Sequence, residues 1–139
     1  MLVNHSQQNS FIKQLILPVK EVVDNNYYLK LDFYEITDSG MPGDQINRNS
    51  QFFPAASLRK GTNLIALEEK ISFPKEGVLL SIKIVENIGN YSNTGGSPVI
   101  IFYNNKNRTD VYALNDKTLK WEKFPHSLFV IAVGMIILQ

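Results

Sequence analysis

The sequence contains no cysteine, and this absence excludes disulfide bonds, thiol chemistry and zinc sites built on cysteine. Its only two histidines, His5 and His126, lie near opposite ends of the 139-residue chain. Neither stands in a His-Glu-x-x-His or His-x-His pattern, so zinc has no support in the sequence. Nucleophilic catalysis needs a base and an orienting group within reach of the nucleophile, and no local pattern supplies them. We therefore predict that the protein is not an enzyme and holds no cofactor.

An excess of charge of one sign is also missing. Lys and Arg number 14 against 13 Asp and Glu, and the basic residues are scattered along the chain. A surface that binds nucleic acid needs a basic patch or stripe. We therefore predict no nucleic-acid partner.

The longest apolar run is too short to cross a membrane as a helix. The segment 127–139, "SLFVIAVGMIILQ", would span about 20 Å as a helix, against a hydrocarbon core of about 30 Å. Its β-branched residues favour a strand, and a bend or bulge near Gly134 would keep that strand from being excessively long. We predict a terminal strand buried on both faces and no transmembrane segment.

Alternation of apolar and polar residues is the dominant pattern of the chain. Within 28–36 the residues at 29, 31 and 33 are apolar, and within 77–86 those at 78, 80, 82 and 84 are apolar. Turn-forming residues separate these segments from shorter strand candidates at 11–17, 62–67, 99–103, 109–114 and 119–124. Several short strands at this spacing, in a chain of one-domain length, predict a sandwich or barrel. We predict an all-β fold, a single jelly-roll-like antiparallel β-sandwich spanning 1–139, with an irregular loop or one helical turn within 44–59.

The segment 38–44, "DSGMPGD", has two possible explanations. Asp38 and Asp44 are the candidate calcium ligands, because short acidic loops on β-sandwiches often supply oxygen ligands to calcium. The segment lacks the ligand order of an EF-hand. Alternatively, Gly40 and Gly43 provide positive φ angles and Asp38 caps a turn between two strands. We favour the second explanation and predict no resident metal.

Exposed aromatic side chains are the other candidate site, since sugars stack on them. Tyr91, Tyr103 and Trp121 are the candidate ligand-binding residues. Tyr91 lies in the polar stretch "GNYSNTGGSP", which is either a contact surface or a solvated connection between strands. Trp121 belongs to a predicted hairpin at 108–124, where it would equally serve as a core or edge anchor.

Three stretches of the chain resemble a β module of bacterial envelope proteins known as carboxypeptidase-regulatory-like. They are "FIKQLILPVKEVVDNNYYLKLDFYEITDSGMPGDQI", "TNLIALEEKISFPKEGVLLSIKIVE" and "VYALNDKTLKWEKF", which together cover about 11–124. The matching positions are 30–34, 40–43, 65–67, 77–78 and 120–121. The chain departs from the family at Ala66, where an acidic residue is usual. The resemblance implies a β-sandwich and carries over no catalytic residue.

The expected function follows from this resemblance and from the missing catalytic patterns. We expect a non-catalytic accessory or interaction module of an exported bacterial envelope protein, located in the periplasm or at the outer membrane. The alternative is a carbohydrate-binding jelly-roll module, with calcium assisting. The first residues, "MLVNHSQQNS", are not a signal peptide, and 1–10 are expected to form a flexible or edge tail. The expected partner is a protein or a glycan, and the expected state is a monomer or weak dimer.

Overall fold

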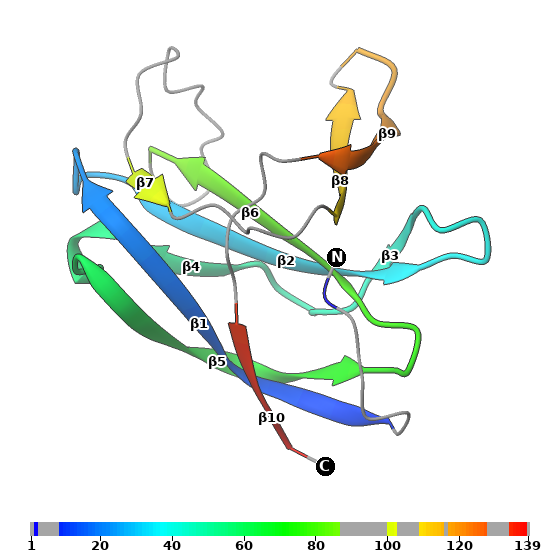
Figure 1. Ribbon diagram of the computed structural model, residues 1–139, viewed down its shortest axis with the longest axis horizontal. Helices are drawn as coiled ribbons and strands as arrows, with labels where there is room; N and C mark the ends of the chain where they lie inside the picture. The colour runs from blue at the N-terminus through cyan, green and yellow to red at the C-terminus, as the bar shows by residue number, and fades with distance from the viewer. Residues whose placement is uncertain are drawn as a thin grey trace.

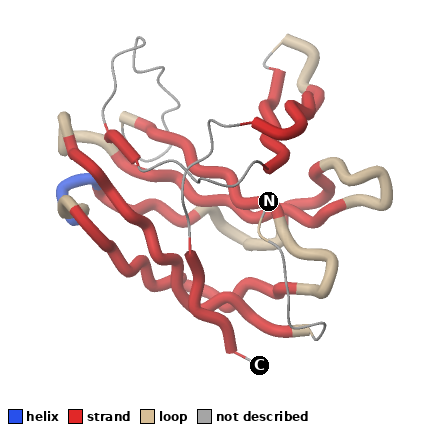
Figure 2. The backbone as a smooth tube through the Cα atoms, in the orientation of Figure 1, coloured by secondary structure: helices blue, strands red, loops and turns tan. Residues whose placement is uncertain are grey.

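The computed structural model describes Leu2 and residues 9–86, 100–102, 109–115, 117–127 and 134–138. Strands dominate these residues, and the single helical element among them is a turn of 3-10 helix, η1 (Figures 1 and 2). The elements, in chain order, are β1 (Ser10–Val22), β2 (Tyr28–Ile36), β3 (Pro42–Gln45), β4 (Gln51–Pro54), η1 (Ala55–Ser57), β5 (Gly61–Phe73), β6 (Leu79–Val85), β7 (Ile100–Phe102), β8 (Thr109–Asn115), β9 (Lys120–Ser127) and β10 (Gly134–Leu138).

Two central strands organise the fold. In the β1 sheet, β5 pairs with one edge of β1, while β10 and then β7 pair with the other edge. In the β2 sheet, β6 pairs with one edge of β2, while β3 and β4 share the other. All these pairings are antiparallel. The hairpin β8–β9 forms a separate ribbon (Figure 1).

The two sheets pack face to face because their central strands alternate. Leu29, Leu31 and Phe33 of β2 are buried in one cluster with Ile12 and Leu15 of β1. Antiparallel sandwiches bury one face of each sheet in this way. The rest of the cluster comes from the β1 sheet, η1 and two loop residues: Leu17, Val19, Ala55, Leu58, Ile65, Ile71, Phe73, Val78 and Ile100.

β5 carries a bulge where it passes β1. Ile12 pairs with Ile71 and Gln14 pairs with Ala66, so residues 67–70 of β5 lie opposite the single residue Lys13. A bulge leaves backbone groups without ladder partners and bends its strand. The Gln51 side chain and the Arg48 backbone N–H form hydrogen bonds with this part of β5.

The predicted all-β antiparallel sandwich is confirmed, and the jelly-roll connectivity stays a prediction. The expected strand at 28–36 coincides with β2. The segment 44–59 holds the helical turn η1, as one of its two alternatives predicted, but also the unpredicted strand β4. Within the expected N-terminal tail, Leu2 exchanges two backbone hydrogen bonds with Val78.

The prediction that the terminal strand is buried on both faces is wrong for β10. Ile136 and Ile137 are 38% and 37% exposed. In the described part of the chain β10 is the outermost strand of the β1 sheet, so water reaches one side of it. Within the residues that the structure describes, no helix is long and apolar enough to cross a membrane.

Candidate functional site

The gap between β3 and β4 is filled by the side chain of Asn47. β3 pairs with β2 at Tyr34 and beyond, and β4 pairs with β2 up to Leu31. On this edge of β2, Asp32 and Phe33 therefore have no partner strand, while β6 pairs with them on the other edge. The Asn47 Oδ1 atom accepts a hydrogen bond from the Phe33 backbone N–H at 2.8 Å, and its Nδ2 group donates to the Leu31 carbonyl at 3.4 Å. The amide of one side chain therefore stands in for the missing peptide group.

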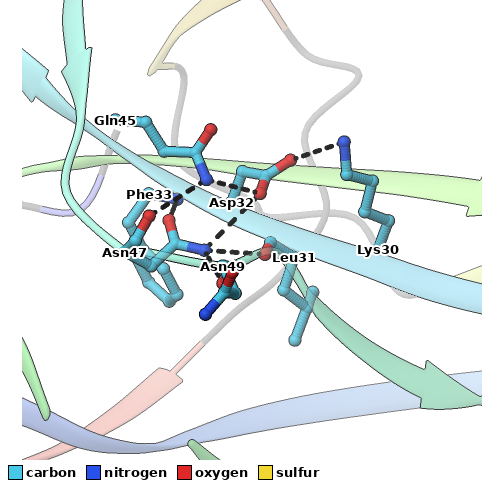
Figure 3. Close-up of polar contacts among 7 residues, drawn as sticks. All are labelled: Lys30, Leu31, Asp32, Phe33, Gln45, Asn47 and Asn49. Atoms are coloured by element: carbon cyan, nitrogen blue, oxygen red, sulfur yellow. Dashed lines mark hydrogen bonds and ion pairs between the residues drawn. The ribbon is translucent and has the colours of Figure 1, made fainter. Parts of the chain in front are cut away.

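A buried ion pair lies beside Asn47, on the face of β2 that points away from the core (Figure 3). The Lys30 Nζ and Asp32 Oδ2 atoms are 3.2 Å apart. The other Asp32 oxygen accepts hydrogen bonds from Gln45 Nε2 at 3.2 Å and from Asn47 Nδ2 at 3.5 Å. Asp32 is only 1% exposed. Burial of a carboxylate requires such compensation by a cation and by hydrogen bonds.

The outer face of the β2 sheet is covered as well as its core face. Leu79 and Val85, which pair with Tyr34 and Tyr28, are buried although they lie outside the core cluster. Trp121 of β9 contacts Tyr34 edge to face, with ring centroids 5.5 Å apart and planes at 69°. Figure 1 shows the β8–β9 hairpin over this face. The hairpin therefore covers part of this face at Tyr34.

The contact with Tyr34 supports the explanation of Trp121 as an anchor. Its ring is half-buried and packs in the T-shaped geometry that aromatic pairs prefer. Trp121 is therefore a packing anchor in this structure. The other two candidate ligand-binding residues, Tyr91 and Tyr103, lie outside the described residues.

The candidate calcium ligands lie on the β2–β3 connection. Asp38 and Asp44 are both exposed, and within the described residues no three His, Asp or Glu side chains come together as a metal site. Thr37 holds the turn: its backbone N–H donates to the Met41 carbonyl at 2.9 Å, and its Oγ1 atom accepts from the Met41 N–H at 3.1 Å. The prediction that Asp38 caps this turn is wrong, because Thr37 forms the capping bonds.

The two glycines of this connection have different roles. Gly40 has a φ of 76°, as predicted. Gly43 does not have a positive φ, so that part of the prediction is wrong. A Cβ atom on Gly43 would lie 3.2 Å from Thr37 Cγ2, so a larger side chain would be crowded by Thr37 at this position.

The outer face of the β1 sheet carries large apolar side chains among its polar ones. Phe11 is 45% exposed and Leu64 is 57% exposed. The register places Leu64 directly beside Ile16, and Ile136 directly beside Gln14, so these side chains lie on three adjacent strands. Sequence reasoning missed this face because it assigned apolar alternation to the core alone.

A shallow hollow of about 400 Å³ lies at the β1–β2 turn. Val23, Asp24, Asn25 and Asn26 line one side, and η1 lines the other. Asp24 Oδ1 accepts hydrogen bonds from the backbone N–H and the side-chain Nδ2 of Asn26, each at 2.9 Å. The remaining carboxylate and amide groups of this turn are of the kind that binds hydroxyl groups.

No family model, no curated protein sequence and no solved structure matches this chain.

Proposed function

We propose that this protein is a non-catalytic interaction module that binds a protein partner through the outer face of its β1 sheet. The observation that carries the proposal is the exposure of Phe11, Leu64 and Ile136 on three adjacent strands. Large apolar side chains that are exposed on one face of a domain are typical of contact sites. The sheet presents that surface on a rigid support.

The polar residues around this apolar face favour a protein over other partners. Exposed Lys13, Lys70 and Glu68 lie on the same two strands as Phe11 and Leu64, so both signs of charge are present. Protein–protein interfaces combine apolar and polar residues in this way. A nucleic acid or an anionic membrane would instead favour a surface of positive charge alone.

The buried polar side chains support a structural rather than a catalytic role. Asp32, Asn47, Gln51 and Asn63 are all buried and all form hydrogen bonds that hold strands or turns in place. Among the described residues, no buried side-chain nitrogen or oxygen lacks a hydrogen-bond partner. Catalytic groups are commonly polar groups held ready for a substrate, and these side chains already have protein partners.

We propose in addition that this chain is a member of the carboxypeptidase-regulatory-like modules of bacterial envelope proteins. The matching residues 30–34 form the middle of β2, and 40–43 form the turn into β3. The other matching residues lie in β5, just before β6 and in β9, so the resemblance concerns residues of several strands. It supports a location in the periplasm or at the outer membrane, which fractionation of the producing cells would test.

Site-specific photocross-linking in the producing cells tests the partner surface. A photoreactive phenylalanine derivative replaces Leu64 in one variant and the exposed Glu76, in the β5–β6 turn, in a matched control. We expect one discrete protein adduct from position 64, lost when Phe11→Lys is added, and none from position 76. An absence of adducts at position 64, or the same adducts at both positions, would contradict the proposal.

A second candidate function is glycan binding, favoured by the hollow at the β1–β2 turn. Its Asp24, Asn25 and Asn26 side chains offer acceptors and donors to sugar hydroxyl groups. A thermal-shift screen against glycans, with and without calcium, tests it. A ligand at a hundredfold excess over Kd stabilises the folded protein by about 2.7 kcal/mol. The shift should disappear in Asn25→Ala, and a shift unchanged by that substitution would place the glycan elsewhere.

A further inference from the structure

The β10 edge of the sandwich leaves one core position incompletely covered. Ile137 pairs with Ile12, which pairs on its other side with Ile71, and both of these side chains are at most 2% exposed. Side chains of directly paired residues lie on the same face of a sheet. Ile137 therefore points toward the core, yet it is 37% exposed. An additional strand beside β10 would cover it.

The composition of β10 also distinguishes it from the other edge strands. Natural edge strands are usually protected by charged residues, by proline or by very short length. β3 and β4 contain proline, and β5 and β6 contain lysine. β7 has only three residues. β10, "GMIIL", has five residues with neither charge nor proline.

We propose that the outer edge of β10 pairs antiparallel with β10 of a second copy of this chain. A twofold axis at Ile136 would set Ile136 opposite its own copy on the outer face. The same register sets Met135 of each copy opposite Ile137 of the other, on the core face. Met135 already packs against the core, so it would extend the apolar row that Ile12 and Ile71 begin.

The uncharged and apolar residues of β10 favour a second copy of this chain as its pairing partner. A twofold interface must be complementary to itself, and an uncharged apolar strand brings no like charges together when it meets its copy. Pairing two five-residue strands buries less surface than the interfaces of stable dimers. The dimer is therefore weak, with a dissociation constant in the range of about 10 to 100 µM.

Sedimentation velocity over about 5 to 500 µM protein tests the dimer. We expect concentration-dependent dimerisation that Ile136→Lys weakens about tenfold or more, because it sets two lysines opposite each other at the axis. The matched control Leu64→Lys changes an exposed residue of β5 and should leave the dimer unchanged. Thermal unfolding of both variants verifies that each is folded.

Hydrogen exchange of the wild-type protein gives a second measurement that needs no variant. Amides of 134–138 should exchange more slowly at high than at low protein concentration. A protein that stays monomeric throughout, or a dimer that Leu64→Lys dissociates and Ile136→Lys does not, would overturn the proposal. The inference concerns pairing along the edge of β10, whereas Leu64 lies on β5 at the other side of β1. Its failure would therefore leave the cross-linking result at position 64 unaffected.

Discussion

Gln51 of β4 is joined to Ala66 of β5 across the sandwich, since its Nε2 group donates a hydrogen bond of 2.8 Å to the Ala66 carbonyl. Its Oε1 atom accepts one of 3.0 Å from the Glu68 backbone N–H. Next to Glu68, the Glu69 carboxylate accepts a hydrogen bond of 2.7 Å from the Arg48 backbone N–H. These bonds satisfy the β5 backbone at its bulge and tie together the edges of the two sheets.

Substitution of Gln51 should therefore destabilise the fold. Gln51→Ala leaves two backbone groups of β5 without partners, and we expect a loss of about 2 kcal/mol in the free energy of unfolding. Gln51→Glu keeps the acceptor for Glu68 but loses the donor for Ala66, so it should also destabilise. Chemical denaturation measures both, with Gln14→Ala on the outer face of β1 as the control. Equal stability of Gln51→Ala and the control would contradict this account.

The role of Asn47 gives a second prediction. Asn47→Ala removes the acceptor of the Phe33 N–H in the middle of β2, and we expect a loss of about 2 kcal/mol. The control is Asn49→Ala, because Asn49 is exposed and receives the bond from Asn47 through its backbone carbonyl. Hydrogen exchange should show faster exchange at Phe33 in the Asn47 variant alone. An unchanged Phe33 amide would show that its bond to Asn47 is unimportant.

Removing only one partner of the Lys30–Asp32 ion pair should lower the stability of the protein more than replacing both partners. Lys30→Met leaves the buried carboxylate without its cation and should cost about 3 kcal/mol or more. Adding Asp32→Asn removes that charge, so the double variant should be more stable than Lys30→Met. Lys83→Met is the control, because Lys83 pairs with Lys30 in register but is exposed. A double variant less stable than Lys30→Met would contradict the prediction.

Trp121, the only tryptophan of the chain, reports on the packing of the β8–β9 hairpin. Tyr34→Leu removes its ring partner, and we expect its fluorescence emission to move to longer wavelength. Loss of the aromatic pair should cost about 1 kcal/mol. Tyr28→Leu, on the same face of β2, should leave the emission unchanged. Similar spectra for the two variants would mean that Tyr34 does not fix the position of Trp121.

Variants in the β2–β3 turn distinguish backbone strain at Gly40 from a steric contact at Gly43. Gly40→Ala places a side chain at a φ of 76° and should cost about 1 kcal/mol. Gly40→Asn should recover part of this loss, because asparagine tolerates that conformation. Gly43→Ala meets Thr37 Cγ2 instead, and Thr37→Ser, which removes that methyl group, should relieve its cost. Thermal unfolding of the four variants distinguishes the two causes.

Alternation in the sequence identified the core face of β2 and of 77–86, because a strand with one face in the core repeats every two residues. It could not identify the burial of Lys30 and Asp32, since Gln45 and Asn47, which bind Asp32, lie on a later segment that shows no alternation. β3 and β4 were not predicted because four-residue strands with proline show no alternation. Asn47 and Gln51 resembled loop residues, because nothing local indicates that a side-chain amide replaces a backbone partner.

The pairing of β10 with β1 also bears on how the protein is made. Leu15 pairs with Met135, about 120 positions later, so β1 is synthesised long before the strand that covers one of its edges. At a translation rate of about 5 to 20 residues per second, β1 waits on the order of 6 to 24 seconds for β10. During that interval one side of an apolar strand is open to neighbouring nascent chains. Chaperone binding to β1 during synthesis would protect it until residues 134–138 emerge from the ribosome.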